Sequence, residues 1–121
     1  MCITSLNFFL PRLIGFQKAT ALMMLGDKVT AEESEELGMI FKAISSESFN
    51  EEVEKLAVKL ANMPSKALGL IKELLNKSNT NTLEQQLELE GKLQIEAALS
   101  EDYTEGVNAF MEKRKPIFKG K

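Results

Sequence analysis

The segment from Thr82 to Pro116 reads TLEQQLELEGKLQIEAALSEDYTEGVNAFMEKRKP, and its pattern predicts the last two helices of an α-helical protein. Apolar residues recur every three or four positions in its first half, as they do in a helix with one apolar stripe. The stripe consists of Leu83, Leu87, Leu89, Leu93 and Ala97. We therefore expect a long helix over residues 83–99, with Thr82 as its cap.

A further helix is predicted over residues 100–115. Ser100 is a favourable N-cap, because its side-chain oxygen can accept a backbone N–H that has no partner within the helix. Asp102 and Glu105 suit the positive end of the helix dipole, and the basic residues at the far end suit the negative end. Pro116 ends the helix, since proline lacks the N–H that continuation requires.

Helical spacing also predicts four shorter helices upstream of this segment. They are expected between Gly15 and Gly26, over residues 31–37, from Ser48 to Ala61 and over residues 65–77. Gly26 and Gly38 end two of them, because glycine readily adopts the left-handed conformation that closes a helix. Thr30, with Glu33 three residues later, matches a capping box, in which each side chain pairs with the other residue's backbone N–H.

Residues 39–44, with the sequence MIFKAI, are the one stretch that favours a strand, since they are rich in β-forming residues and are followed by two serines. A lone strand leaves backbone groups unpaired, so this segment either pairs with another or runs extended along a surface. The prediction is a mainly α chain of five or six helices with at most one short strand. We expect a linking segment over residues 1–44 and a helical domain over residues 45–121.

The composition is that of an ordinary globular protein. The chain has 121 residues, of which 44% are hydrophobic and 27% are charged, so a single structural unit with a modest core is expected. The formal net charge of −3 gives no reason to expect nucleic acid as a partner. Histidine is absent from the sequence, which removes histidine-dependent catalytic arrangements and most zinc sites.

The cysteine and the first ten residues predict the cellular location. Cys2 is the only cysteine and cannot form an intrachain disulfide, which fits a reducing cytoplasm. The first ten residues are apolar, but they lack the features of a signal peptide and are too short to span a bilayer, which needs about 20 apolar residues. We therefore expect a cytoplasmic protein without membrane contact, whose apolar start is buried against this chain or another.

Few residues carry the features of a catalytic or metal-binding group. The acidic run from Glu32 to Glu36 is interpreted as a solvated helix face, rather than as a carboxylate cluster for a metal or for proton transfer. The methionines are interpreted as core residues, and Tyr103 as a packing residue rather than a general acid. The motifs therefore predict no catalytic residue and no metal site.

Phe110 and Lys113 are the candidate ligand-binding residues. They lie three positions apart on the predicted last helix, so ring and ammonium group share one face and could receive a purine ring with its attached phosphate. Five Lys or Arg residues and no acid between Lys113 and Lys121 could attract a phosphate locally. The alternative is that Phe110 packs in the core while Lys113 and the basic end are simply solvated.

Four blocks of the sequence, taken in order, resemble the C-terminal part of the crotonase superfamily, the enoyl-CoA hydratases and isomerases. The blocks are LPRLIG at residues 10–15, LGDKVTAEE at 25–33, ELGMI at 36–40 and AFMEKRKPIF at 109–118. The resemblance is nearest to the isomerases of phenylacetate breakdown, and it implies the helical C-terminal domain of the ClpP/crotonase-like fold. It implies a parent protein that acts on acyl-CoA thioesters by enolate-stabilised hydration or double-bond isomerisation, with the acyl group and the choice of reaction left open.

The resemblance also implies a ligand and an assembly. The family residues that match Phe110 and Lys113 contact the adenine and phosphate end of a coenzyme A that is bound mainly by another subunit. Coenzyme A thioester is then the substrate of the parent family, with no covalently bound cofactor. The family forms homo-oligomers, so a trimer or hexamer is the implied assembly.

By the same resemblance, this chain lacks the family's catalytic parts. The larger N-terminal part of the family supplies the N–H groups that stabilise the oxyanion and the hydratase glutamates, and it lies upstream of the matching blocks. In the phenylacetate-type isomerases an acid–base aspartate precedes the Phe-Leu-Pro block, and counting back places it on Ile3 and the next glycine on Ser5. Isoleucine cannot transfer a proton, so we expect a truncated chain that is inactive alone, whether the truncation is natural or artificial.

Two other functions remain open. A stand-alone helical module could self-associate, or cap full-length relatives, through the apolar segment at residues 6–10. A protein that binds free acyl-CoA without chemistry would rest on Phe110 and Lys113. Such binding would be weak, because half a pocket excludes little water and is poorly preorganised.

Overall fold

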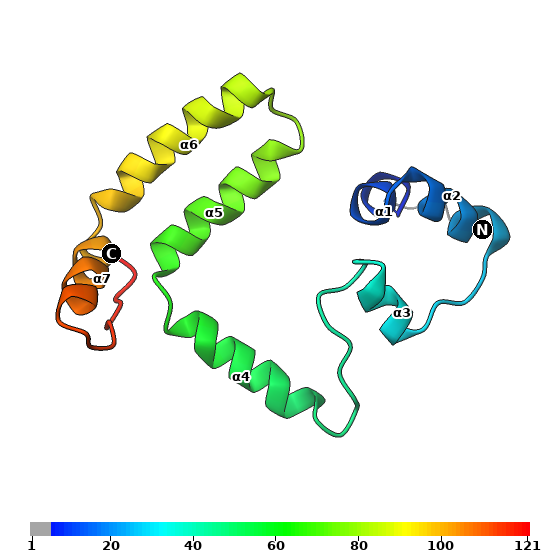
Figure 1. The fold of residues 1–121 in the computed structure, drawn as a ribbon, viewed down its shortest axis with the longest axis horizontal. Coiled ribbons are helices and arrows are strands. Elements are labelled where there is room, and N and C mark those ends of the chain that lie inside the picture. Colours follow the sequence, from blue (N-terminus) through cyan, green and yellow to red (C-terminus); the bar gives the residue numbers. More distant parts are fainter. Residues whose placement is uncertain (1–5) are drawn as a thin grey trace. The chain divides into compact units, whose positions relative to one another are not determined.

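The computed structural model describes residues 6–121, and seven α-helices form the framework of this part of the chain (Figure 1). They are α1 (Leu6–Ile14), α2 (Phe16–Leu25), α3 (Ala31–Glu36), α4 (Phe49–Ala61), α5 (Ser65–Ser78), α6 (Leu83–Ala98) and α7 (Glu101–Met111). The chain divides into two compact units, residues 1–50 and residues 51–121. The predicted mainly α fold is confirmed, with more helices than the five or six expected.

The first helix of the described chain, α1, was not predicted from the sequence. α1 packs on α2, and each contributes one buried apolar residue, Leu10 and Ala19. α1 forms although it contains Pro11, whose missing N–H removes one helical hydrogen bond. The Arg12 guanidinium supports this turn, because it donates to the Phe8 carbonyl at 2.7 Å and lies 3.7 Å from the centre of the Phe8 ring. The described part of the apolar start is therefore helical, with Leu10 as its buried residue.

Two predicted helix-end signals are confirmed in α2 and α3. Gly26 takes a left-handed conformation at φ 71°, and its N–H donates to the Leu22 carbonyl at 3.0 Å, which ends α2. At the start of α3, the Glu33 N–H donates to Thr30 Oγ1 at 3.1 Å and the Thr30 N–H donates to the Glu33 carboxylate at 2.9 Å. This is the predicted capping box, and it fixes where the short helix begins.

The strand expected at residues 39–44 is not formed. Gly38, at φ 76°, turns the chain back over α3, and the next N–H donates to the Ser34 carbonyl at 2.8 Å. The Ala43 N–H then donates to the Glu35 carboxylate at 2.7 Å. Backbone groups that a strand would pair with a neighbouring strand are bound to α3 instead, so the β-forming side chains do not produce a strand.

In the second unit, α5 and α6 form an antiparallel helical hairpin (Figure 1). The turn between them ends in a second capping box, in which the Gln85 N–H donates to Thr82 Oγ1 at 3.3 Å and the Thr82 N–H to Gln85 Oε1 at 2.9 Å. The Gln86 side-chain amide links the two helices by donating to the Leu74 carbonyl at 3.4 Å. Thr82 thus caps α6 as predicted, and Leu93 on the same helix is buried.

α7 starts where it was predicted to start but ends earlier. Ser100 Oγ accepts the Tyr103 N–H at 3.1 Å, which confirms the predicted N-cap. The helix was expected to reach Lys115, yet it ends at Met111. This shorter helix changes the position of Lys113, which was expected to lie on it.

Few apolar side chains are buried in the described part of the chain. The buried ones are Leu10, Ala19, Leu93 and Ala109. Many larger apolar side chains on α1 and on α4 to α7 are about half exposed or more, which marks surfaces that a partner could cover. Within residues 6–121, no helix combines the length and the apolar character needed to cross a membrane.

Candidate functional site

The end of α7 places the two candidate residues differently from the predicted helix. Phe110 lies in the last turn, whereas Lys113 lies beyond the helix in a left-handed conformation at φ 54°. The Lys113 N–H donates to the Phe110 carbonyl at 3.2 Å, and the Arg114 N–H donates to the Ala109 carbonyl at 3.0 Å. These two bonds define a Schellman motif, which usually has glycine at the left-handed position. The expectation that both side chains project from one helical face is therefore wrong, although the two residues remain joined across the turn.

Both candidate side chains face solvent in the described chain. Phe110 is 82% exposed, which argues against the alternative that it is a core residue of this unit. Lys113 is also exposed, and its ammonium group has no hydrogen-bond or ion-pair partner within residues 6–121. An exposed aromatic ring and an unpaired ammonium group suit a flat anionic ligand, because the ring can stack and the ammonium group can pair with charge. We refer to Phe110 and Lys113 together as the Phe110–Lys113 surface.

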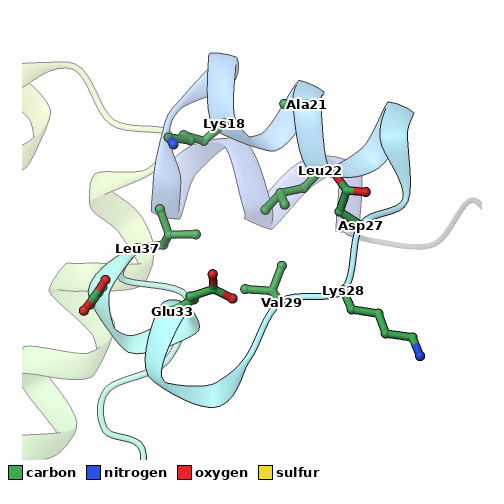
Figure 2. Close-up of a pocket in the computed structure, with 9 residues that line it drawn as sticks. Lys18, Ala21, Leu22, Asp27, Lys28, Val29, Glu33 and Leu37 are labelled. Atoms are coloured by element: carbon green, nitrogen blue, oxygen red, sulfur yellow. The ribbon is translucent and has the colours of Figure 1, made fainter.

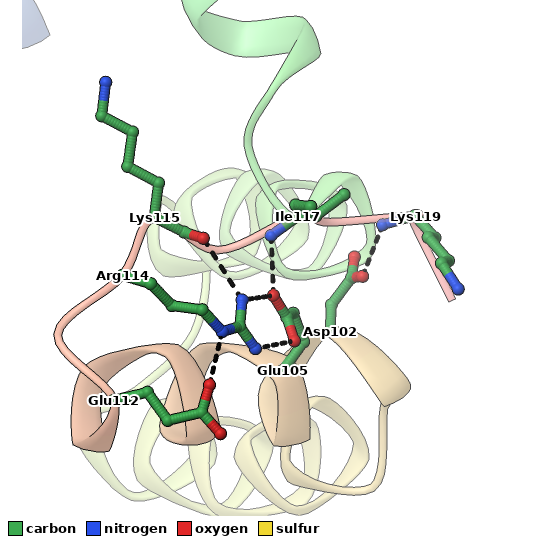
Figure 3. Close-up of polar contacts among 7 residues, drawn as sticks. All are labelled: Asp102, Glu105, Glu112, Arg114, Lys115, Ile117 and Lys119. Atoms are coloured by element: carbon green, nitrogen blue, oxygen red, sulfur yellow. Dashed lines mark hydrogen bonds and ion pairs between the residues drawn. The ribbon is translucent and has the colours of Figure 1, made fainter.

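An ion-pair network joins α7 to the C-terminal tail, which we define as residues 112–121 (Figure 3). The Arg114 guanidinium donates to both carboxylate oxygens of Glu105, at 2.5 and 2.8 Å. Its Nε donates to the Glu112 carboxylate at 2.6 Å, and Glu105 also accepts the Ile117 N–H at 2.8 Å. A bidentate pair of this kind fixes orientation as well as distance, so it restrains the first turn of the tail.

The network shifts the ionisation of its two central groups. The pKa of Glu105 is lowered to about 2, first because Arg114 donates to its carboxylate and second because the Ile117 N–H does so. The pKa of Arg114 is raised above its usual value by its hydrogen bonds to Glu105 and then to Glu112. Glu105 therefore stays ionised, and the pair stays charged, throughout the neutral and mildly acidic range.

A buried carboxylate holds the far end of the tail. Asp102 is 3% exposed, and its two oxygens accept the N–H groups of Lys119 at 2.6 Å and Gly120 at 2.8 Å. The Asp102 N–H in turn donates to the Lys121 carbonyl at 3.1 Å. Gly120 has φ 76°, and a Cβ there would lie 2.5 Å from Ser65 Oγ, so glycine is required at this close approach. Asp102 and Glu105 thus hold the tail along α7 at two successive points.

The positions of Asp102 and Glu105 in the sequence predicted only an interaction with the helix dipole, and their contacts with the tail were not predicted. The groups that their carboxylates bind lie between 9 and 18 positions further along the chain, so the spacing of residues along a helix does not indicate these contacts. The sequence feature that could have indicated these contacts is a strongly basic tail, which follows a helix with acidic residues in its first turns. Ile3 and Ser5, which were matched to the family's catalytic segment, lie outside the described residues.

A hollow between α2 and α3 in the first unit is a weaker candidate site (Figure 2). Its volume is about 390 Å³. It is lined by Lys18, Ala21, Leu22, Asp27, Lys28, Val29, Glu33, Glu36 and Leu37. The lining charges are of both signs, and Glu33 is already engaged in the capping box, so the hollow favours neither an anion nor a cation. The exposed Lys113 side chain gives the Phe110–Lys113 surface a positive charge, which suits an anion better than a cation.

Comparison with known proteins identifies the family. The family model described as Enoyl-CoA hydratase/isomerase matches residues 3–121. The chain is 44% identical over 115 residues to the 1,2-epoxyphenylacetyl-CoA isomerase of Escherichia coli, which covers 95% of this chain and 44% of that protein. It is 37% identical over 115 residues to a "Probable enoyl-CoA hydratase" of Rhodobacter capsulatus, which covers 95% of this chain and 45% of the relative.

Solved structures agree with these matches. The chain superposes on subunit I of an enoyl-CoA hydratase from Geobacillus kaustophilus with a TM-score of 0.91 and 38% identity, covering 97% of this chain and 46% of that one. An enoyl-CoA hydratase from Polaromonas gives a TM-score of 0.88 at 30% identity, covering 95% of this chain and 45% of that one. The chain therefore spans less than half the length of these relatives and has the helical fold of part of their crotonase domain. This chain belongs to the enoyl-CoA hydratase/isomerase family, in the crotonase superfamily.

Proposed function

We propose that this chain supplies the nucleotide-contacting surface of an acyl-CoA enzyme, with Phe110 and Lys113 as contacts for the adenine and phosphate end of coenzyme A. The observation that carries the proposal is an aromatic ring that is 82% exposed, three residues before a lysine whose exposed ammonium group is unpaired within residues 6–121. A relative with 44% identity is named 1,2-epoxyphenylacetyl-CoA isomerase, so a coenzyme A thioester is the expected substrate of the parent protein. The parent reaction is hydration or double-bond isomerisation through a stabilised enolate, without a covalently bound cofactor.

In this proposal the chain is inactive alone. Asp102 is the one buried carboxylate among the described residues, and both of its oxygens already accept N–H groups of the tail. The other described carboxylates lie at or near the surface, where water competes for any proton they would transfer. We therefore expect none of these groups to act as the general acid or base of this reaction in the chain alone.

An absorbance assay tests the inactivity directly. The purified chain is mixed with crotonyl-CoA, and separately with a 3-enoyl-CoA, while the absorbance of the conjugated thioester is followed. A full-length enoyl-CoA hydratase under the same conditions is the positive control. We expect no turnover by the chain above the rate without protein, and turnover would overturn the proposal.

A second candidate function, self-association or capping of full-length relatives, is favoured by the exposed apolar residues of α1. Leu6, Phe8, Phe9 and Leu13 are each between 48% and 56% exposed in the described chain. These apolar groups lie close together on one short helix. Covering them with another surface is favourable, because it removes them from water. The resulting assembly would be a homo-oligomer, a trimer or hexamer in a cytoplasmic protein.

Light scattering after size-exclusion chromatography tests this second candidate. We expect a mass above that of the 13.5 kDa monomer, and a shift toward the monomer when Phe9→Ser is introduced. Phe41→Ser is the matched control, because Phe41 is 87% exposed but lies outside α1. A monomeric wild-type chain at micromolar concentration would contradict self-association.

A further inference from the structure

Lys113 has a conformation that its own residue type does not favour. Left-handed φ values such as its 54° are uncommon for residues with a Cβ, and Lys113 is the one non-glycine example in the described chain. Such conformations persist where the surrounding structure holds them in place, and they concentrate at ligand sites. The residues on either side of Lys113 should therefore contain the groups that hold it.

Those groups belong to the network centred on Glu105. Arg114, the next residue, is fixed at its side chain by the two Glu105 oxygens and at its backbone by the Ala109 carbonyl. Glu112, on the other side of Lys113, accepts from Arg114 Nε at 2.6 Å. Both neighbours of Lys113 are thus restrained through one guanidinium group, and the Lys113 side chain itself makes no hydrogen bond or ion pair with residues 6–121 that would hold its backbone.

Glu105 also limits where the chain can go after the turn. It accepts the Ile117 N–H at 2.8 Å, so the backbone is held on both sides of Pro116 (Figure 3). The turn is therefore closed at its start by helical bonds of α7 and at its end by Glu105. A ligand that meets the Phe110–Lys113 surface would find the Lys113 backbone already ordered.

We propose that Glu105 is a positioning residue that, through Arg114, holds Lys113 in its left-handed conformation and so directs the Phe110–Lys113 surface toward the anionic end of a nucleotide. The inference rests on the proposed function for the nature of the ligand, but not for the conformation of Lys113. Glu105 acts through Arg114 and does not touch the ligand. Its role is to order the Lys113 backbone before the ligand binds. Binding then costs less conformational entropy, which increases affinity.

The first test measures the conformation without any ligand. In labelled protein, the three-bond HN–Hα coupling and the 13Cα shift of Lys113 report its φ, and hydrogen exchange at the Arg114 amide reports the bond to Ala109. Glu105→Gln should move the Lys113 values toward those of an unstructured chain and speed Arg114 exchange by about threefold to tenfold. Glu101→Gln is the matched control, because it removes the same charge from an exposed residue of α7 whose side chain makes no hydrogen bond or ion pair within residues 6–121. Unchanged Lys113 values in Glu105→Gln would overturn the proposal.

A rescue experiment separates positioning from general loss of stability. Glycine adopts the left-handed conformation without help, so combining Glu105→Gln with Lys113→Gly should restore slow exchange at Arg114. General loosening of the second unit would not be corrected by a change at this one position. Persistent fast exchange in the double variant would therefore contradict a positioning role.

The second test measures binding of adenosine 3′,5′-bisphosphate, the nucleotide portion of coenzyme A. We expect Glu105→Gln to weaken binding by about threefold to tenfold, the size of effect that loss of preorganisation produces, and Glu101→Gln to leave it unchanged. Equal affinity of Glu105→Gln and the wild-type chain would overturn the positioning role in binding. If the wild-type chain does not bind, the proposed ligand is wrong, and the coupling and exchange results still decide whether Glu105 holds Lys113.

Discussion

Helices α3 and α7 end in the same backbone turn with different residues at its left-handed position. In α3 this residue is Gly38, at φ 76°, and in α7 it is Lys113, at φ 54°. Each turn has the same pair of backbone hydrogen bonds back to the helix. Glycine takes this conformation without steric cost, whereas the Cβ of lysine brings a cost of roughly 1–2 kcal/mol. The end of α7 therefore needs support that the end of α3 does not.

The difference separates a turn that only ends a helix from a turn that presents a side chain. Gly38 has no side chain to present, and the chain after it folds back over α3. Lys113 has an exposed side chain three residues after the exposed Phe110, and the contacts of Arg114 and Asp102 hold the tail that follows. A lysine at a position suited to glycine is consistent with a binding role, since glycine would end the helix at lower cost.

The largest expected effect comes from removing the buried support of the tail. Asp102→Ala leaves the N–H groups of Lys119 and Gly120 without their charged acceptor, and we expect it to destabilise the second unit by about 3 kcal/mol. Denaturant unfolding measures the loss, and faster amide exchange at Lys119 and Gly120 locates it. Glu101→Ala, which changes an exposed acid next to Asp102, is the control and should have little effect. An unchanged unfolding midpoint in Asp102→Ala would show that the tail contacts contribute nothing.

A smaller loss is expected at the end of α3. Gly38→Ala forces a residue with a Cβ to adopt φ 76°, and we expect a destabilisation of roughly 1–2 kcal/mol. The new Cβ would lie 3.9 Å from the Leu13 carbonyl oxygen, which is an ordinary contact, so the cost is one of backbone conformation. Gly69→Ala is the control, because Gly69 lies inside α5 with nothing within 4 Å, and there alanine should stabilise the helix. Equal effects of the two substitutions on stability would contradict a conformational cost that is specific to Gly38.

A gain in stability, instead of a loss, is expected at the matching position of α7. Lys113→Gly relieves the left-handed strain, and we expect a gain of about 0.5–1 kcal/mol in the free energy of unfolding. The same variant should bind adenosine 3′,5′-bisphosphate more weakly, because the ammonium group is lost. Lys115→Gly removes the same charge at a residue with negative φ, so it should not stabilise the protein. A Lys113→Gly variant that is less stable than wild type would show that the backbone of Lys113 carries no strain.

The smallest effect is expected from lowering the pH, because the Glu105 ion pair stays intact near neutral pH. The pKa of Glu105 is about 2 in the folded chain and 4.5 for an ordinary glutamate, so its ion pair stabilises the fold fully above pH 4.5 and is lost as pH falls toward 2. The charged groups that face this carboxylate are Arg114 and Lys119, with Glu112 on the far side of Arg114. A 13C titration of the Glu105 carboxyl should show a midpoint near 2, rising toward 4.5 in Arg114→Leu. A wild-type midpoint near 4.5 would contradict the bidentate pair.

The sequence predicted local features well because their causes are local. The caps at Thr30, Thr82 and Ser100 and the stops at Gly26 and Gly38 depend on side chains within a few positions, and each is confirmed. The strand expected at residues 39–44 does not form, because the turn at Gly38 allows its backbone groups to hydrogen-bond to α3. Residue type alone does not reveal that competition.

The geometry at the end of α7 differs from the prediction. The pattern of basic residues before Pro116 suggested that α7 continues to Lys115, because cations favour a helix C-terminus. Contacts from Glu105 and Asp102 to the returning tail end the helix at Met111 instead, and these contacts are distant in sequence. α1 was not predicted, because the apolar start indicated only a segment buried against this chain or another, whereas packing against α2 favours a helix.

The most direct test of the account is a titration of the labelled 121-residue chain with coenzyme A, followed by NMR. We expect chemical-shift changes that concentrate at Phe110, Lys113 and Arg114, saturate at millimolar ligand, and disappear in Lys113→Ala. That result would place the nucleotide end of coenzyme A on the Phe110–Lys113 surface. Shifts that are absent at millimolar ligand, or that are spread over the basic tail and persist in Lys113→Ala, would contradict the central claim that the end of α7 is a preformed site.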